Sequence, residues 1–230
     1  MHAYVINLEN RADRWKSVLS QFSGLKVPII RIDAVKMDSL RVSELYVAPG
    51  VAATWKSHQR AMLEFLKSNE DYGLVLEDDF LLTKEWDINV LYEAVALNPD
   101  FFQIGFLITG PIDRIDLLIR NHFDFVLKVL YKLSKVSIRI NRYFGGRLLV
   151  KEQSGVGWKV VKNNIRAGGH AYLVSRKFAQ AAQEMNSPAF TSADGMYISL
   201  GDVRSFRMFR FRKSIINQTN SATSVNQRYL

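Results

Sequence analysis

Residues 73–79 read Gly-Leu-Val-Leu-Glu-Asp-Asp, an apolar run that leads directly into three consecutive acids. The apolar part is typical of a buried strand, and ligands of open α/β sheets bind outside the carboxyl ends of strands. Adjacent carboxylates repel one another, and a divalent cation with oxygen ligands relieves that repulsion. The stretch therefore predicts either a metal site, with Glu77 and Asp79 on one side of the strand, or an acidic surface turn.

Strand and helix patterns alternate on both sides of this stretch. The predicted strands are residues 4–8, 27–32, 101–107 and 171–174, and the predicted helices are residues 15–22 and 52–66. Pro49-Gly50 is a turn signal before the second helix. Strand–helix–strand order indicates parallel pairing, so we predict an α/β fold with a mostly parallel central sheet, in one domain of residues 1–230.

The composition is that of a folded protein that prefers anionic partners. Of the 230 residues, 48% are hydrophobic and 23% are charged, which excludes wholesale disorder. A net charge of +9 favours nucleotides, phosphates, nucleic acid or an acidic membrane surface. The lack of cysteine excludes a disulfide scaffold, a thiolate metal site and cysteine catalysis. With no signal-peptide pattern and no membrane-spanning apolar window, we expect a cytoplasmic protein.

A helical insertion is predicted at about residues 111–165. Between Arg114 and Arg142 charged residues recur every three or four positions, and they are all basic after Asp124. The pattern suits either an amphipathic helix packed on the domain or an interfacial helix on anionic lipid. The basic residues of this segment after Asp124 are Lys128, Lys132, Lys135, Arg139 and Arg142.

Other polar residues are expected near the acids. Arg11 and Arg14 follow the first strand, where guanidinium groups would suit diphosphate oxygens, although each could equally lie on a solvated helix face. Ser57 and His58 fall on the second predicted helix, where a lone histidine is more often structural than catalytic.

In combination these residues resemble glycosyltransferase family 25, the bacterial lipooligosaccharide galactosyltransferases. The motifs that carry the resemblance are residues 5–8 with Arg11 and Arg14, residues 57–58, residues 76–79, residues 169–176, Asp194, and residues 214–218 with Ser221 and Ser224. It spans residues 4–224 and is weakest at 111–165. The acidic motif reads Glu-Asp-Asp where the family has Asp-x-Asp, and the outer carboxylates are retained.

The resemblance implies a GT-A type nucleotide-sugar-binding fold. It implies inverting transfer of a sugar, with galactose expected, from a UDP-sugar to a lipid-linked oligosaccharide in lipooligosaccharide biosynthesis. Glu77 and Asp79 would hold Mn²⁺ or Mg²⁺, and the enzyme would lie in the cytoplasm or peripherally on the cytoplasmic face of the inner membrane. The implied substrate-binding residues are Asn7, Leu8, Arg11, Arg14, Ser57, His58, Asp78, His170, Gln218 and Ser221.

Such a reaction needs a cation and a base. A divalent ion stabilises the negative charge that grows on the departing UDP, and inversion by single displacement needs a general base near the acceptor hydroxyl. Asp194 is the candidate catalytic base, with Asp202 in reserve. Because Asp194 falls at a predicted helix start, it could equally be an N-cap.

Two other functions stay open as alternatives. Residues 204–213 interleave arginines with phenylalanines, which is typical of either a nucleic-acid-binding surface or an edge strand with alternating exposure. A metal-dependent phosphodiesterase is the second alternative, but such sites usually gather several histidines, and the four in this chain do not cluster. We favour the edge-strand interpretation of residues 204–213 and expect no nucleic-acid partner.

Overall fold

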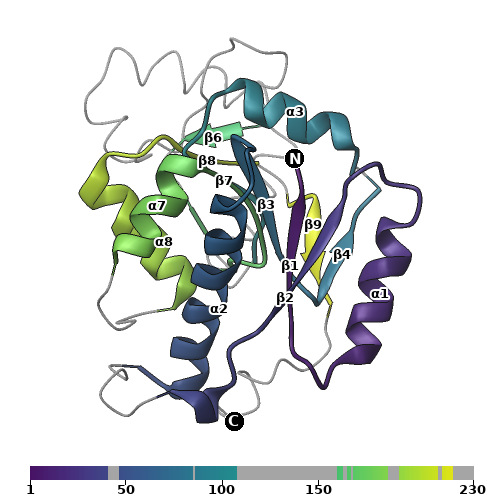
Figure 1. Ribbon diagram of the computed structural model, residues 1–230. Coiled ribbons are helices and arrows are strands. Elements are labelled where there is room, and N and C mark those ends of the chain that lie inside the picture. The colour runs from purple at the N-terminus through teal and green to yellow at the C-terminus, as the bar shows by residue number, and fades with distance from the viewer. Residues whose placement is uncertain are drawn as a thin grey trace, which may run out of the picture.

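The computed structural model describes residues 1–40, 47–84, 86–107, 160–162, 165–166, 168–185, 192–211 and 214–219. Within these residues helices cover both faces of a seven-stranded sheet (Figure 1). The strands of this sheet are β1 (Ala3–Asn7), β2 (Ile29–Asp33), β3 (Tyr72–Glu77), β5 (Phe101–Gly105), β6 (Val160–Lys162), β7 (Ala171–Ser175) and β8 (Met208–Phe211). The helices are α1 (Ala12–Phe22), α2 (Pro49–Leu66), α3 (Ile88–Ala96), α7 (Arg176–Glu184) and α8 (Ala193–Arg204). A short 3-10 turn, η1, covers Met37–Ser39.

The sheet has the order β2-β1-β3-β7-β5-β8-β6. Strands β1, β2, β3, β5 and β8 run in one direction, whereas β7 and β6 are antiparallel to their neighbours. The predicted α/β fold with a mostly parallel sheet is thereby confirmed, as a mixed sheet with β7 between its two parallel parts. A separate pair, β4 (Phe80–Leu82) and β9 (Ile216–Gln218), is antiparallel.

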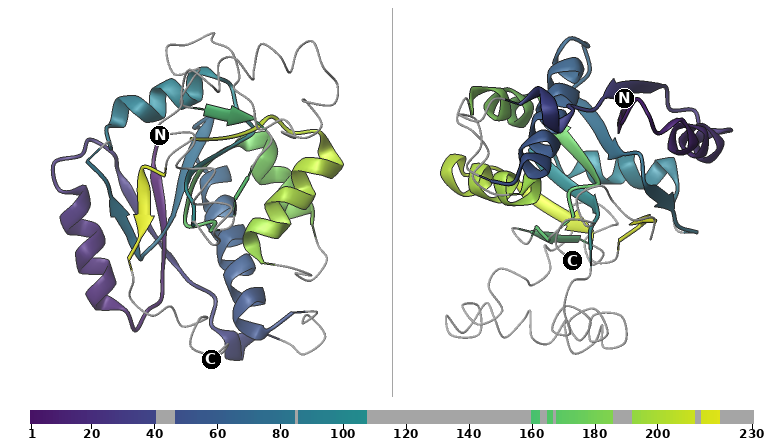
Figure 2. Two further views of the ribbon diagram at one scale, coloured as in Figure 1. Left: turned by 180° about the vertical axis from the view of Figure 1, so that it is seen from behind. Right: turned by 90° about the horizontal axis from the view of Figure 1, so that it is seen from below.

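Each face of the sheet has its own hydrophobic core. Helices α2, α7 and α8 pack on one face and α1 and α3 on the other (Figure 2). Side chains alternate along β1, so Tyr4 and Ile6 enter the core on the side of α2, α7 and α8. Ala3 and Val5 enter the core on the side of α1 and α3. Because both faces are covered, every residue of this strand is buried. The uninterrupted apolar run in the sequence therefore reflects a strand inside a three-layer fold.

The first turn of α2 contains Pro49 and Gly50, so the predicted turn at these residues is wrong. Proline is well suited to the first helical position, because its fixed φ is already helical and its missing N–H would have no partner there. The helix consequently begins three residues earlier than the predicted start at Ala52.

The arginine- and phenylalanine-rich stretch at residues 204–213 is not an edge strand with alternating exposure. Its strand, β8, lies between β5 and β6, and all four of its residues are buried. The Arg210 guanidinium lies over the Phe106 ring at 5.1 Å and donates to the carbonyl of Phe211. With Phe209 and Phe211 in the core, these aromatic side chains are not placed to stack on nucleic-acid bases.

The predicted insertion at residues 111–165 is partly described. Strand β6 falls within it and pairs with β8, so residues 160–162 belong to the central sheet and not to a helical insertion. Consecutive β-branched residues at 160 and 161 favour the extended conformation. The predicted amphipathic helix between Arg114 and Arg142 lies outside the described residues.

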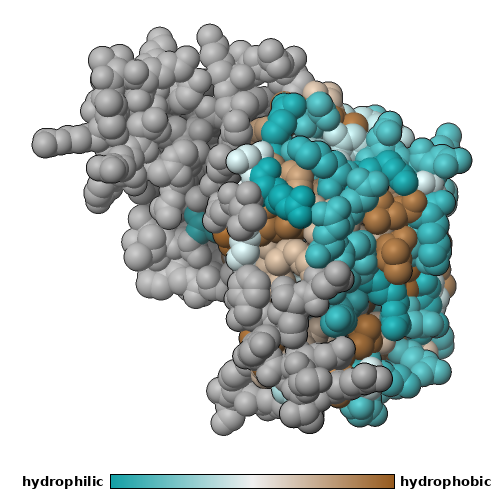
Figure 3. Space-filling model, turned by 60° about the vertical axis from the view of Figure 1, so that its left-hand side comes forward, coloured by the Kyte–Doolittle hydropathy of each residue, from teal (hydrophilic) through white to brown (hydrophobic). Residues whose placement is uncertain are grey.

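On the face that Figure 3 shows, the described surface is mostly hydrophilic, with small separate hydrophobic areas. Large apolar side chains with high exposure include Tyr92 at 58% and Leu63 at 49%. Single exposed apolar residues of this kind are common on folded proteins. In the described part of the chain, every helix is too short or too polar to span a lipid bilayer.

The end of β5 packs so closely on its neighbours that glycine is needed there. A Cβ at Gly105 would lie 2.5 Å from His170 Nε2 and 2.6 Å from the carbonyl oxygen of Ile216. Because the second neighbour is backbone, we expect Gly105→Ala to lower the free energy of unfolding by about 2–3 kcal/mol, measured by urea denaturation.

Gly201→Ala is the matched control for this glycine. The nearest atoms to its added Cβ belong to the flexible Met208 side chain, and alanine is the better helix former. The Gly201 variant should therefore lose less stability than the Gly105 variant. A Gly105→Ala protein as stable as the wild type would contradict the packing described at this edge of the sheet.

Candidate functional site

A cavity of about 800 Å³ lies at the carboxyl ends of β1, β2 and β3. The strand register places Asn7 beside Asp33 and Ile6 beside Glu77, so the three strands end at nearly the same level. The amino-terminal half of α2 forms another wall. The lining residues are Ile6, Leu8, Asn10, Arg14, residues 34–38, Pro49, Gly50, Ala53, Thr54, Ser57, His58 and residues 77–79. The volume suits a small-molecule or cofactor site.

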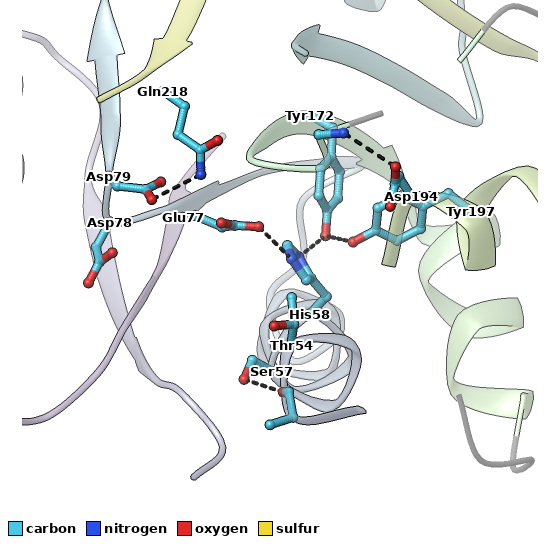
Figure 4. Close-up of polar contacts among 12 residues, drawn as sticks. Thr54, Ser57, His58, Glu77, Asp78, Asp79, Tyr172, Asp194, Tyr197 and Gln218 are labelled. Atoms are coloured by element: carbon cyan, nitrogen blue, oxygen red, sulfur yellow. Dashed lines mark hydrogen bonds and ion pairs between the residues drawn. The ribbon is translucent and has the colours of Figure 1, made fainter. Parts of the chain in front are cut away.

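Glu77 is the last residue of β3, and its carboxylate is directed toward α2 (Figure 4). Its Oε1 lies 3.2 Å from His58 Nε2, and its backbone N–H donates to the carbonyl of His170 at 2.9 Å. Burial acts to raise the pKa of Glu77, but the hydrogen bond from His58, together with the electrostatic effects of His58, His170 and Arg14, lowers it. Glu77 is thus an anion at neutral pH, with a side chain that is 27% exposed.

Asp78 has strong partners of its own and is only 8% exposed. Arg14 Nη1 donates to its Oδ1 at 2.8 Å, and Asn7 Nδ2 donates to its Oδ2 at 2.6 Å. Figure 4 shows this carboxylate directed away from those of Glu77 and Asp79. Asp78 therefore holds the Arg14 guanidinium at the cavity instead of facing the other two acids.

Asp79 is 3% exposed and incompletely hydrogen-bonded. Gln218 Nε2 donates to its Oδ2 at 2.9 Å, and Arg14 Nη1 lies 3.5 Å from the same oxygen. Its buried Oδ1 has no hydrogen-bond partner among the described residues. Burial, with added repulsion from Glu77 and Asp78, raises the pKa of Asp79 to about 7, although Gln218 and Arg14 act to lower it.

These acids fit a divalent cation held by few protein ligands. The described residues contain no cluster of three or more histidine and acidic side chains arranged as a metal site. A cation bound through Glu77 and Asp79 alone would keep coordination positions for water and phosphate oxygens, as Mg²⁺ usually does. The unpartnered Asp79 Oδ1 is the atom that most needs such a cation.

About half of the predicted substrate-binding residues line the cavity, namely Leu8, Arg14, Ser57, His58 and Asp78. Ser57 Oγ accepts from the backbone N–H of Val35 at 2.8 Å and donates to the carbonyl of Ala53 at 2.7 Å. It therefore ties the loop after β2 to α2, and this contact shapes the cavity wall.

The other described candidates lie next to the cavity but are not part of its lining. Arg11 forms a two-bond contact with Asp13 on α1, at 3.0 and 2.8 Å. His170 is 1% exposed, and its Nε2 lies 3.1 Å from the carbonyl of Ile216. Asn7 and Gln218 contact the acids directly, as described above. Ser221 lies outside the described residues.

Asp194 occupies the first turn of α8 but is not its N-cap. The N-cap is Ser192, and the Asp194 carboxylate accepts from the backbone N–H of Gly168 at 3.3 Å. Asp194 is not among the cavity-lining residues. The reserve candidate, Asp202, also falls within α8.

Several lining residues were not found from the sequence. Lys36 and Thr54 line the cavity; Lys36 Nζ forms an exposed ion pair with Glu9 at 2.7 Å, and Thr54 Oγ1 donates to the carbonyl of Gly50 at 2.9 Å. Lys36 could have been found from its position just after the predicted strand at residues 27–32. The carboxyl end of that strand lies at the same edge of the sheet as the acids.

No protein-family model matches the sequence, and no curated relative matches it significantly. The function must therefore be inferred from the geometry of the cavity.

The raised pKa of Asp79 predicts that its charge opposes folding. The ordinary value is 3.8 and the value in the fold is about 7, a difference worth about 4 kcal/mol between the two protonation states. Because asparagine removes the charge but weakens the contact with Arg14, we expect Asp79→Asn to stabilise the metal-free protein by about 2 kcal/mol at pH 8. Thermal unfolding in EDTA measures this change.

The sign of the pH dependence gives a further check. A carboxyl whose pKa rises on folding destabilises the folded state increasingly from pH 4 to pH 7, so the advantage of Asp79→Asn should shrink as the pH falls through that range. Asp71→Asn, at an exposed aspartate, is the matched control and should stay within about 0.5 kcal/mol of wild type. Equal stability of the wild type and both variants at pH 8 would show that the charge of Asp79 does not oppose folding.

Proposed function

We propose that this protein is an inverting glycosyltransferase that uses a UDP-sugar and a divalent cation. The observation that carries the proposal is a cavity at the strand ends that is bordered by two carboxylates, one with an unpartnered buried oxygen. The resemblance of the sequence to glycosyltransferase family 25 supports the same conclusion. It also supports a GT-A type fold and galactose as the transferred sugar.

Glu77 and Asp79 would hold the cation in this proposal. A bound Mn²⁺ or Mg²⁺ would stabilise the negative charge that grows on the diphosphate as the sugar leaves. Arg14 adds a fixed positive charge at the same wall, because Asp78 holds its guanidinium at 2.8 Å. Lys36 is the other lysine or arginine among the described lining residues, and it would also be available to the phosphates.

Asp194 remains our proposed general base. Its carboxylate would accept the proton of the acceptor hydroxyl as that oxygen attacks the anomeric carbon from the face opposite UDP. Since Asp194 is not in the cavity lining, the acceptor would approach along the amino-terminal end of α8.

For the acceptor we propose a lipid-linked oligosaccharide, with the protein bound peripherally at the cytoplasmic face of a membrane. This part of the proposal rests on the resemblance and on the basic pattern between Arg114 and Arg142. Basic residues near an anionic surface each contribute about 1 kcal/mol to such attachment.

A screen of UDP-sugars with Mn²⁺ tests the donor and the cation together. We expect the matching UDP-sugar, at about 100 times its Kd, to raise the Tm by roughly 5–10 °C with Mn²⁺ and much less with EDTA. Mn²⁺-dependent UDP release should be lost in Asp79→Asn and retained in Asp71→Asn. Full UDP release by the Asp79 variant, or release that EDTA does not change, would overturn the proposed role of the acids.

The contribution of Lys36 can be tested against a closely matched lysine. Both Lys36 and Lys67 form exposed ion pairs with a glutamate, at 2.7 and 2.6 Å, but only Lys36 is among the cavity-lining residues. Lys36→Gln should weaken UDP binding by about threefold, because an exposed charge contributes modestly, whereas Lys67→Gln should leave it unchanged. Equal UDP affinities in calorimetry would remove Lys36 from the site.

A further inference from the structure

A continuous row of hydrogen bonds leads from α8 to the acidic residues (Figure 4). Tyr197 Oη donates to Tyr172 Oη at 2.8 Å, Tyr172 Oη lies 2.8 Å from His58 Nδ1, and His58 Nε2 lies 3.2 Å from Glu77 Oε1. The two tyrosines and the histidine are fully buried, whereas Glu77 faces the cavity. The tyrosine hydroxyls have no role in the proposed reaction, so their presence needs another explanation.

Counting protons determines how this row is arranged. The three contacts need three protons, one from each hydroxyl and one from the His58 ring. If Tyr197 donates to Tyr172, then Tyr172 donates to Nδ1 of His58, and the histidine proton is on Nε2. That proton then points at the Glu77 carboxylate, which can only accept.

The opposite arrangement leaves a buried group unsatisfied. With the proton on Nδ1 alone, the Nε2 lone pair would face the lone pairs of the Glu77 carboxylate. Leaving a buried polar group without a hydrogen-bond partner is costly.

We infer that Tyr172 and Tyr197 are positioning residues that hold the His58 ring with its Nε2 proton toward Glu77, and so fix the Glu77 carboxylate toward the cavity. The cation that this carboxylate would bind belongs to the proposed function, on which this part of the inference rests. With Oε1 occupied by His58, the second oxygen of Glu77 stays open to the cavity. Loss of a residue that hydrogen-bonds to a metal ligand typically weakens metal binding by about 10–100-fold.

The role of each tyrosine hydroxyl can be tested separately from the packing of its ring. Tyr172 stacks on Phe101 with ring centroids 5.0 Å apart, and the Tyr172 and Tyr197 rings are 4.9 Å apart. Phenylalanine at either tyrosine position keeps these ring contacts and removes only the hydroxyl. A change in the protonation pattern of His58 in such a variant therefore reports on the hydrogen bond and not on packing.

The first measurement is ¹⁵N NMR of the histidine rings in the metal-free full-length protein. His58→Gln identifies the His58 signals, and in the wild type His58 Nε2 should carry a proton. Tyr172→Phe should shift the His58 ring toward a mixture of Nδ1- and Nε2-protonated forms. Tyr197→Phe should do so less because it acts through Tyr172, and Tyr92→Phe, on the surface of α3, should have no effect. A wild-type His58 protonated on Nδ1 only, or a spectrum unchanged by Tyr172→Phe, would overturn the inference.

The second measurement is binding of Mn²⁺ alone, followed by electron paramagnetic resonance. We expect Tyr172→Phe to weaken Mn²⁺ binding by about 10-fold and Tyr92→Phe to leave it unchanged. If the wild type binds Mn²⁺ and the Tyr172 variant binds it equally, only the positioning role is overturned. If the wild type does not bind Mn²⁺, the proposed cation site is overturned, and the positioning role is then decided by the NMR measurement alone.

Discussion

The crowding of three adjacent carboxylates at the end of β3, two of them buried, is the constraint around which the described structure is arranged. Each acid is paired with a different part of the chain: Glu77 with His58 on α2, Asp78 with Arg14 on α1, and Asp79 with Gln218 on β9. A buried charge without a partner costs several kcal/mol, so these contacts restrict where each element can lie. The two helical layers and the small β4–β9 pair are thereby tied to one strand end.

The partners of the three acids supply hydrogen bonds but little positive charge. Arg14 is the one formal cation in direct contact with the three acids among the described residues, and the remaining partners are an imidazole and two amides. The pKa of about 7 for Asp79 is the physical sign of this excess negative charge. Native proteins keep such conflicts mainly where function requires them, and a cation would resolve this one. The excess negative charge that destabilises the metal-free fold is thus also the reason to propose a cation site at these acids.

Structural features set by the local sequence pattern could be predicted, whereas features set by contacts between distant residues could not. The strand before Glu77, and the position of the acids at a sheet edge, follow from apolar runs and strand–helix alternation. The direction of β7 does not, because a buried strand has the same apolar pattern in either orientation. Arg210 looked exposed because the ring of Phe106 that covers its guanidinium is remote in sequence. Tyr172 and Tyr197 resembled ordinary core aromatics, since their hydroxyl partners come from other elements.

The contact between Gln218 and Asp79 has a consequence for how the chain is made. The two residues are 139 positions apart, so at ordinary rates of translation the acid waits roughly 7–28 s for its amide partner to be synthesised. Strands β1, β2 and β3 can pair during that interval, because all of their residues are synthesised before Asp79 and leave the ribosome before β9 does. A nascent chain in this state exposes an acidic strand end without β9. Completion of the candidate site therefore has to wait for the synthesis of β9, and a chain interrupted before β9 would carry the acids without it.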